Sequence, residues 1–328
     1  MRGGRRLGPA ELMEGLYLAQ AALALHELGV LAAMETTVTA EELAAQCGVD
    51  AAMLRGTLDY VAERTTLVRK TGEGYGRTEE YGREAEFLFD LYGGAYGGNA
   101  AGVARVLKNP RAAARMVDRG RHAAAFAKAG GEGNAWIAAV VRDLGWNRVL
   151  DIGCGPAAML VELARGNEGF AGWGLEFSEA MREAARRNIR GAGVGRRVRV
   201  LEGDLKRMET AVPEKVLSKV EAVTACQAVN ELFGNGTSGA VAWLRRLRRV
   251  LPGRPLLIAD YYGRLGNGRK AGRNAVTLLH DYAQLLSGQG VPPAGIEEWV
   301  RIYESAGVRP VHVVEDVSST RFLHIVVL

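Results

Sequence analysis

A glycine-rich turn follows a short apolar run at residues 149–157, VLDIGCGPA. Gly153 and Gly155 let the backbone approach a ligand closely, because a glycine has no Cβ. Asp151 ends the apolar run, where its carboxylate could neutralise a ligand ammonium. Glu176 follows about twenty residues later, the spacing at which an acid accepts hydrogen bonds from both ribose hydroxyls. These residues predict a site for a ligand that carries a nucleoside and an ammonium group.

A second polar group lies further along the chain, in the segment QAVNEL. Glu231 can accept a proton there, whereas its neighbour Asn230 cannot do so at neutral pH. His280 lies in an apolar helical stretch, where a lone histidine is often a core residue, but the adjacent Asp281 favours a functional role. His122 is a further candidate to face the site. The remaining histidines are interpreted as structural: His26, His312 and His324.

Strands and helices alternate from residue 148 onward, and this order must position the polar residues. Apolar runs of strand length occur at 148–155, 172–178, 198–204, 221–229 and 254–262, and a terminal pair at 309–316 and 320–328. Helical stretches separate most of them, which predicts a mostly parallel, doubly wound sheet. A G-x-G-x-x-G nucleotide loop would need a third glycine where Ala158 stands. A phosphate-binding or redox Rossmann domain is therefore disfavoured.

The motif at Asp151 resembles motif I of the class I methyltransferases, which use S-adenosylmethionine (SAM). The resemblance implies that Glu176 binds the ribose of SAM and that Asp204 holds the adenine amino group. Phe177 and Leu205 would flank the adenine. It also implies that the cofactor-binding set consists of Asp151, Gly153, Gly155, Glu176, Phe177, Asp204, Leu205 and Cys226.

The N-terminal region has a winged-helix pattern, with helices followed by two short strands around the turn at 67–80. Thr39 and Glu42 form a capping-box pattern at the start of one helix. The helix at 51–64 balances Arg55 and Arg64 with two acids, so it suits phosphate contacts poorly. The long apolar first helix is instead typical of a subunit interface. We expect a homodimer that forms through this domain and binds no nucleic acid.

The whole chain resembles the plant- and actinomycete-type small-molecule O-methyltransferases, which join a winged-helix dimerisation domain to a class I methyltransferase domain. The resemblance implies a winged-helix dimerisation domain at 1–90, a helical linker covering the active site at 91–146 and a SAM-binding domain at 147–328. Those enzymes have a histidine base after the fourth strand, in a segment that reads L-H-D. Asn230 stands at that position here, which argues against O-methylation with a histidine base.

Residues 278–308 are similar to a segment of bacterial α-keto acid C-methyltransferases of the phenylpyruvate and 2-ketoarginine type. Some of those hold a divalent metal with two histidines and an acid. The corresponding residues here would be Glu231 and His280, with Asn230 in place of the first histidine, and a weak neutral ligand there disfavours a metal. We therefore expect no metal. If a metal is bound, we expect Glu231 and His280 to be its ligands.

The predicted function is SAM-dependent C-methylation of a small molecule in secondary metabolism. Glu231 would accept a proton as a carbon attacks the methyl group, Asn230 would orient the substrate or Glu231, and His280 would hydrogen-bond the substrate. Suitable acceptors are an electron-rich ring carbon such as indole C3, or the β-carbon of an α-keto acid. The alternatives are O- or N-methylation, and a non-catalytic winged-helix regulator that senses SAM or binds DNA.

Composition sets outer limits on these interpretations. The chain has 328 residues, is 48% hydrophobic and 24% charged, and carries a net charge of +5. Its arginines are scattered, so charge alone does not indicate nucleic-acid binding. No apolar run approaches the roughly 20 residues of a membrane span. The three cysteines are widely separated, which predicts neither a disulfide framework nor a zinc site. We expect a cytoplasmic protein without membrane contact.

Overall fold

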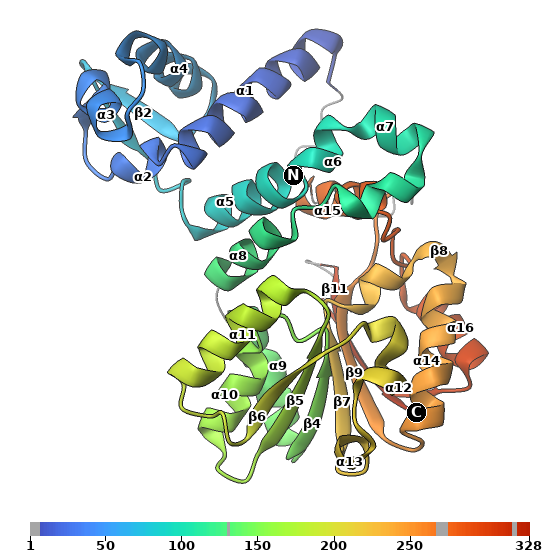
Figure 1. Ribbon diagram of the computed structural model, residues 1–328. Helices are drawn as coiled ribbons and strands as arrows, with labels where there is room; N and C mark the ends of the chain where they lie inside the picture. Colours follow the sequence, from blue (N-terminus) through green and yellow to red (C-terminus); the bar gives the residue numbers. More distant parts are fainter. Residues whose placement is uncertain (1–6, 130–131, 267–274, 317–319) are drawn as a thin grey trace. The chain divides into compact units, whose positions relative to one another are not determined.

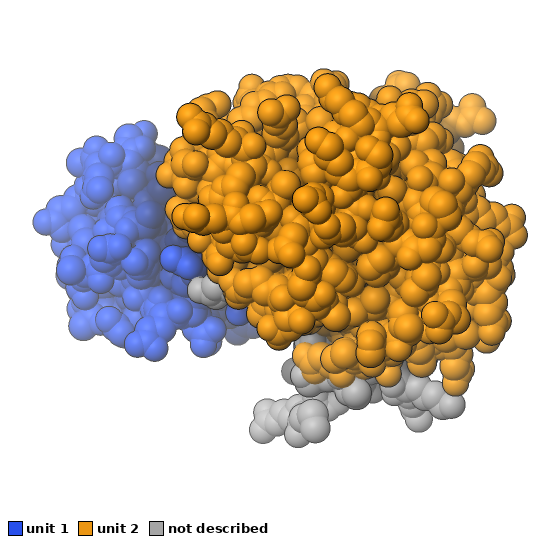
Figure 2. Space-filling model, turned by 90° about the horizontal axis from the view of Figure 1, so that it is seen from below, with its two compact units in different colours: residues 1–94 blue, residues 95–328 orange. Residues whose placement is uncertain are grey.

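The computed structural model describes residues 7–129, 132–266, 275–316 and 320–328 (Figure 1). The chain divides into two compact units, residues 1–94 and 95–328, which are coloured separately in Figure 2. No helix within the described ranges is long and apolar enough to cross a membrane.

The first unit is mainly helical. It contains α1 (Pro9–Glu27), α2 (Val30–Ala33), α3 (Ala40–Cys47), α4 (Ala51–Arg64) and α5 (Arg83–Leu88), with the π-helical η1 (Phe89–Ala95) at its boundary. The strands β1 (Val38–Thr39), β2 (Val68–Thr71) and β3 (Gly74–Arg77) form a small antiparallel sheet in the order β1-β3-β2. The two strands predicted around the glycine-rich turn are confirmed.

Local signals in the sequence explain how these helices begin. The Thr39 hydroxyl accepts the Glu42 backbone N–H (3.3 Å) and the Glu42 carboxylate accepts the Thr39 N–H (2.9 Å), which confirms the predicted capping box. Asp50 caps α4 by accepting the Met53 N–H (2.8 Å). Asp59 on α4 accepts hydrogen bonds from Lys70 and Tyr75 of the hairpin, which joins the helix to the sheet. Helices and sheet bury one apolar cluster that includes Leu31, Leu43, Leu58 and Val61.

The second unit contains a seven-stranded sheet in the order β10-β11-β9-β7-β4-β5-β6. The strands β4 (Arg148–Ile152), β5 (Ala171–Glu176), β6 (Val198–Glu202), β7 (Ala222–Cys226) and β9 (Pro255–Tyr261) run parallel. The terminal strands β10 (Arg309–Glu315) and β11 (Arg321–Val327) form an antiparallel pair, and β11 lies antiparallel to β9. The predicted α/β Rossmann-like fold, with a mostly parallel sheet, is confirmed.

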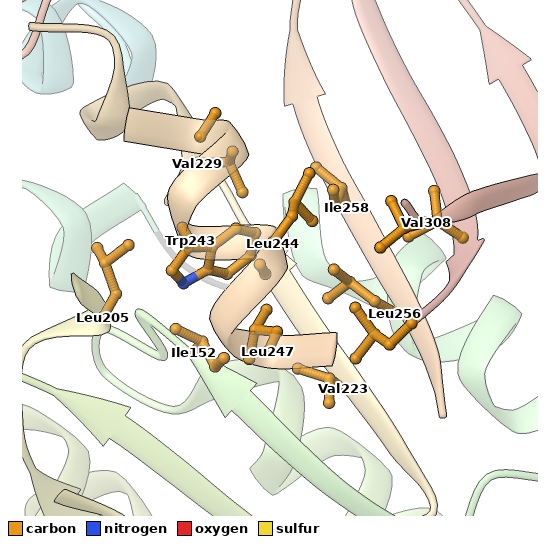
Figure 3. Close-up of a cluster of buried hydrophobic side chains, with 14 of the residues drawn as sticks. Ile152, Leu205, Val223, Val229, Trp243, Leu244, Leu247, Leu256, Ile258 and Val308 are labelled. Carbon is orange, nitrogen blue, oxygen red and sulfur yellow. The ribbon is translucent and has the colours of Figure 1, made fainter. Parts of the chain in front are cut away.

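Helices cover both faces of this sheet, as Figure 1 shows. One face carries α9 (Glu132–Asp143), α10 (Ala158–Gly166) and α11 (Glu179–Gly191). The other carries α12 (Met208–Ala211), α13 (Glu214–Leu217), α14 (Ser238–Val250) and α16 (Ile296–Ala306). Successive residues of β4 face opposite sides of the sheet: Val149 is buried with the helices of the first face, and Leu150 with those of the other face. Figure 3 shows Trp243 and Leu247 of α14 in one buried cluster with Val223 and Leu256 of the sheet.

The second unit contains further elements besides the seven-stranded sheet and the helices named above. They are α6 (Gly97–Ala101), α7 (Val103–Lys108), the 3-10 helix η2 (Pro110–Arg115), α8 (Arg119–Ala129), α15 (Ala275–Leu286), the 3-10 turns η3 (Leu205–Arg207) and η4 (Val229–Leu232), and β8 (Gly234–Thr237). The short strand β8, which the sequence did not suggest, is no member of the seven-stranded sheet.

Candidate active site

A pocket opens at the carboxyl ends of β4, β5 and β7, where ligands bind in open α/β sheets. Most of the residues predicted to bind the cofactor line it, and Glu231 does so as well. These lining residues are Asp151, Gly153, Gly155, Glu176, Phe177, Leu205, Cys226 and Glu231. The structure therefore brings together groups that are far apart in the sequence, because neighbouring parallel strands end at one edge of the sheet.

The turn after β4 forms the floor of the pocket. Gly153 and Gly155 have φ angles of 72° and 51°, a left-handed conformation that glycine adopts without strain. The N–H groups of Gly153 and Cys154 donate to the Leu175 carbonyl, which holds the turn against β5 (2.8 and 3.2 Å). A Cβ at position 153 would lie 2.7 Å from the Cβ of Ala228, so the turn also fits closely against the segment after β7.

Two buried carboxylates stand beside this turn. Asp151 pairs in register with Thr224 of β7, whose hydroxyl donates to Asp151 Oδ1 (2.7 Å). Burial raises the pKa of Asp151 to about 7. Glu176 accepts the N–H groups of Gly155 (3.1 Å) and Ser178 (2.8 Å). Burial also raises the pKa of Glu176, and these hydrogen bonds oppose the rise. Each acid is thus held in a fixed orientation toward the pocket.

Of the three residues predicted to contact the adenine, two line the pocket and one is exposed and does not. Leu205 and Phe177 line the pocket, and Phe177 is 44% exposed. Asp204 is exposed and is not among the lining residues. Its carboxylate accepts the Lys206 N–H (2.8 Å) and thereby caps the 3-10 turn η3. Its proposed contact with the adenine amino group therefore stays a prediction.

Glu231 reaches the pocket from η4, the turn that follows β7. Burial raises the pKa of its carboxyl, and the charge of Arg119 opposes that rise. The adjacent Asn230 is buried, and its backbone N–H donates to Asp260 Oδ2 (3.0 Å). Asp260 also accepts the Tyr261 N–H (3.0 Å), and burial raises its pKa to about 7. Asp260 thus holds the turn that carries Glu231.

His280 lies on α15 and is not among the residues that line the pocket. Its Nε2 lies 3.2 Å from Gln284 Nε2, and its ring makes an edge contact with Tyr261 at 5.2 Å between centroids. Burial lowers the pKa of His280 to about 4, so the ring is neutral at neutral pH. Asp281 instead accepts the N–H groups of the loop residues Arg264 and Leu265. Its role there is structural.

The helix α8 supplies a wall of the pocket through Arg119, His122 and Phe126. Their spacing of three and four residues places them on one helix face. The His122 ring lies 4.8 Å from Phe126 and 5.9 Å from Tyr96, measured between centroids. Burial lowers the pKa of His122 to about 4. His122 was a candidate on sequence grounds, whereas no sequence signal marked Arg119 or Asp260.

Comparison with known proteins indicates which class of reaction the domain catalyses. Residues 149–252 match the family model described as a methyltransferase domain. This domain is a SAM-dependent methyltransferase. The predictions of a methyltransferase and of SAM as its cofactor are thereby confirmed.

Solved structures similar to the chain include methyltransferases of small molecules. The mitomycin 7-O-methyltransferase MmcR is 19% identical with a TM-score of 0.76, over 97% of this chain and 96% of that one. PigF with SAH is 18% identical with a TM-score of 0.76, over 97% and 99%. Human N-acetylserotonin methyltransferase in complex with SAM is 14% identical with a TM-score of 0.73, over 99% of each chain. At these identities the likeness shows the fold that the chains share.

Proposed function

We propose that the protein methylates a carbon atom of a small molecule and that Glu231 accepts the proton which that carbon or its ring loses. The proposal rests on which of the three carboxylates in the pocket already accept hydrogen bonds from the protein. Thr224 binds Asp151, and two backbone N–H groups bind Glu176. Within the described part of the chain, no group donates a hydrogen bond to the Glu231 carboxylate. Glu231 is therefore the pocket carboxylate left available to a substrate.

The other pocket residues fit the groups of SAM. The Asp151 carboxylate suits its ammonium, and Glu176 suits the two ribose hydroxyls. The left-handed turn at Gly153 and Gly155 leaves room for the chain of the cofactor, because no side chain projects there. SAM supplies an electrophilic methyl group on a sulfonium. The residues that hold SAM contribute chiefly by positioning this methyl group in line with the attacking atom.

The strength of Glu231 as a base favours a carbon atom as the acceptor of the methyl group. A ring carbon that attacks the methyl group forms a new C–C bond, and the sulfonium leaves as a thioether with the electron pair of the broken S–C bond. The ring then becomes cationic, and its N–H or C–H proton becomes acidic enough for a carboxylate to remove. Burial raises the pKa of Glu231 and so strengthens it as a base. An electron-rich ring such as an indole meets these requirements.

The donor set does not fit a metal. Among the residues that the structure describes, no group of three or more His, Cys, Asp or Glu side chains could hold a metal ion. Glu231 and His280 therefore lack a third ligand of this kind, and Asn230 can offer only a neutral amide oxygen, which is a weak ligand. We derive no step through a metal, and we place the ring carbon ahead of the α-keto acid as the acceptor.

Methylation of oxygen or nitrogen is the second candidate. The names of the similar structures favour it, since MmcR is a mitomycin 7-O-methyltransferase. Reaction with SAM labelled with ¹³C in the methyl group, across indoles, α-keto acids and phenols, distinguishes the candidates. Carbon–proton correlation NMR of the product shows the atom that bears the label. A label bonded to carbon supports our proposal, and a label bonded to oxygen or nitrogen refutes it.

We further propose that the chain forms a homodimer through the N-terminal unit. The α1 side chains of Leu12, Met13, Leu16 and Tyr17 are 51–69% exposed and lie on adjacent turns. A contiguous apolar surface of this kind is typical of an interface. Leu16→Glu should convert a dimer into a monomer, as measured by light scattering after size-exclusion chromatography. A wild-type protein that is monomeric at micromolar concentration would refute the proposal.

The regulator alternative receives less support. Asp59 of α4 binds Lys70 and Tyr75 within its own unit, so the helix keeps an acid beside its basic residues. A neutral helix is a poor phosphate ligand. Sequence-specific DNA binding that persists at moderate salt in a gel-shift assay would favour the regulator over the enzyme dimer.

A further inference from the structure

Gln227 holds a backbone conformation that a residue with a side chain rarely adopts. It directly follows β7 and has a φ of 51°, in the left-handed region that glycine occupies without strain. Among the residues that the structure describes, Ala157 and Thr320 also have a positive φ, but both are buried, so their side chains contribute to packing. Gln227 is exposed instead. Burial of its side chain therefore does not offset the strain of its backbone.

The Gln227 side chain belongs to the candidate active site. Gln227 lines the pocket together with Ala228 and Glu231 of the same segment. Its backbone N–H donates to the carbonyl of Ala259 on β9 (2.8 Å), which fixes the start of this segment against the sheet. Within the described part of the chain, no group forms a hydrogen bond with its side-chain amide. A primary amide both donates and accepts hydrogen bonds, so a ligand can use either function.

The order of the strands indicates which ligand this amide would meet. The sheet runs β9-β7-β4-β5-β6, so β7 and β5 lie on opposite sides of β4. Glu176 ends β5, where it suits the ribose, and Asp151 lies on β4, where it suits the ammonium. Neighbouring strands are about 4.8 Å apart, so the end of β7 lies roughly 10 Å from the strand that carries Glu176. Gln227 therefore lies on the side of Asp151 away from the ribose, on the segment that also carries Glu231.

Backbone strain of this kind persists mainly where a site needs the residue that bears it. We propose that the Gln227 amide binds the small-molecule substrate that receives the methyl group. The amide would form a hydrogen bond with an oxygen, an N–H or an O–H of that substrate. The substrate must then carry such a group besides the atom that is methylated. The inference rests on a substrate bound beside Glu231, as proposed above, and it holds whether carbon, oxygen or nitrogen is methylated.

Two other roles for Gln227 predict different behaviour. As a ligand of the cofactor, it would contribute to the affinity for S-adenosylhomocysteine. As a residue that only turns the chain after β7, it could be replaced by glycine without any loss of function, because glycine adopts a left-handed φ freely. Substitutions that separate the amide from the backbone strain distinguish these roles from substrate binding.

The experiment compares wild type with Gln227→Ala and Gln227→Gly, which both remove the amide. Gln46→Ala, at an exposed glutamine of α3, is the control. The substrate is the indole, α-keto acid or phenol that the labelling screen identifies. Both Gln227 variants should raise its KM about 3- to 10-fold, the effect of one lost hydrogen bond, with little change in kcat or in the calorimetric affinity for S-adenosylhomocysteine. Only Gln227→Gly relieves the strain, so its urea midpoint should lie about 0.3 M above that of Gln227→Ala.

A further variant, Gln227→Glu, identifies the substrate group that the amide binds, because it keeps an oxygen that accepts hydrogen bonds and removes the NH2 donor. A KM close to wild type assigns a substrate N–H or O–H, and a rise equal to that of Gln227→Ala assigns a substrate oxygen.

Three results overturn the proposal: an unchanged KM in both Gln227→Ala and Gln227→Gly, a parallel loss of affinity for S-adenosylhomocysteine, or a urea midpoint of Gln227→Gly no higher than that of Gln227→Ala. The role of Glu231 is tested separately through kcat, and the methylated atom through the labelled product. Failure of either leaves the KM comparison at Gln227 valid.

Discussion

Alanine at position 153 should destabilise the methyltransferase unit for two separable reasons. The left-handed φ of 72° costs a residue with a Cβ about 1–2 kcal/mol. The new Cβ would also lie 2.7 Å from the Cβ of Ala228, well inside the ordinary contact distance. Overpacking of this kind costs about 1–3 kcal/mol. Gly153→Ala should therefore lower the free energy of unfolding by about 2–5 kcal/mol.

A control and a rescue separate the two contributions. Gly193 has a φ of 69°, and a Cβ at that position would meet no other atom within 4 Å, so Gly193→Ala should cost only about 1–2 kcal/mol. Adding Ala228→Gly to Gly153→Ala removes the clash and should recover about 1–3 kcal/mol in a double-mutant cycle.

Urea unfolding followed by tryptophan fluorescence measures these values. All 5 tryptophans lie in residues 95–328, so the signal reports that unit: Trp136, Trp146, Trp173, Trp243 and Trp299. Equal costs for Gly153→Ala and Gly193→Ala, or no coupling to Ala228→Gly, would refute the close packing on which the site depends.

Other consequences concern the buried acids. Because burial raises the pKa of Asp151 to about 7, the folded state holds this proton more tightly than the unfolded chain does. The free energy of unfolding of the ligand-free protein should fall as pH rises from about 4 through 7, and Asp151→Asn should flatten the urea-derived profile. Thr224→Val removes the hydroxyl that donates to Asp151, so calorimetry near neutral pH should show weaker S-adenosylhomocysteine binding; unchanged affinity would count against this role. Asp260→Asn replaces one acceptor oxygen by an NH2 group, so the hydrogen bond from either the Asn230 or the Tyr261 N–H is lost and the turn that carries Glu231 is held less firmly. The value of kcat should then fall roughly 10- to 100-fold while cofactor affinity is retained. Parallel losses of turnover and cofactor affinity would indicate general damage to the fold instead.

The sequence predicted those parts of the protein that local pattern controls. The strand-and-turn signal around Asp151 and the spacing to Glu176 pointed to two residues that line the same pocket. The capping box at Thr39 and Glu42 depends on residues three positions apart, and it formed as predicted. Such features are set by short-range spacing, and the sheet order brings their strand ends to one edge.

Features that depend on packing between distant elements could not be predicted. Asp260 ends its strand as an ordinary-looking acid, and only the fold brings the Asn230 N–H to it. Arg119 joins the pocket because α8 packs against α11, a contact that no local pattern encodes. Asp281 favoured a functional role for His280 because the two are adjacent in sequence. Adjacent helical residues point in different directions, and Asp281 binds a loop instead.

The central claim is that Glu231 accepts the proton released during methyl transfer. Its direct test compares wild type, Glu231→Gln and the exposed control Glu209→Gln, using the acceptor that the labelling screen identifies. We predict that Glu231→Gln loses about 10²- to 10⁴-fold in kcat while its affinity for S-adenosylhomocysteine stays close to wild type, and that the control keeps full activity. Turnover by Glu231→Gln at the wild-type rate would contradict the account.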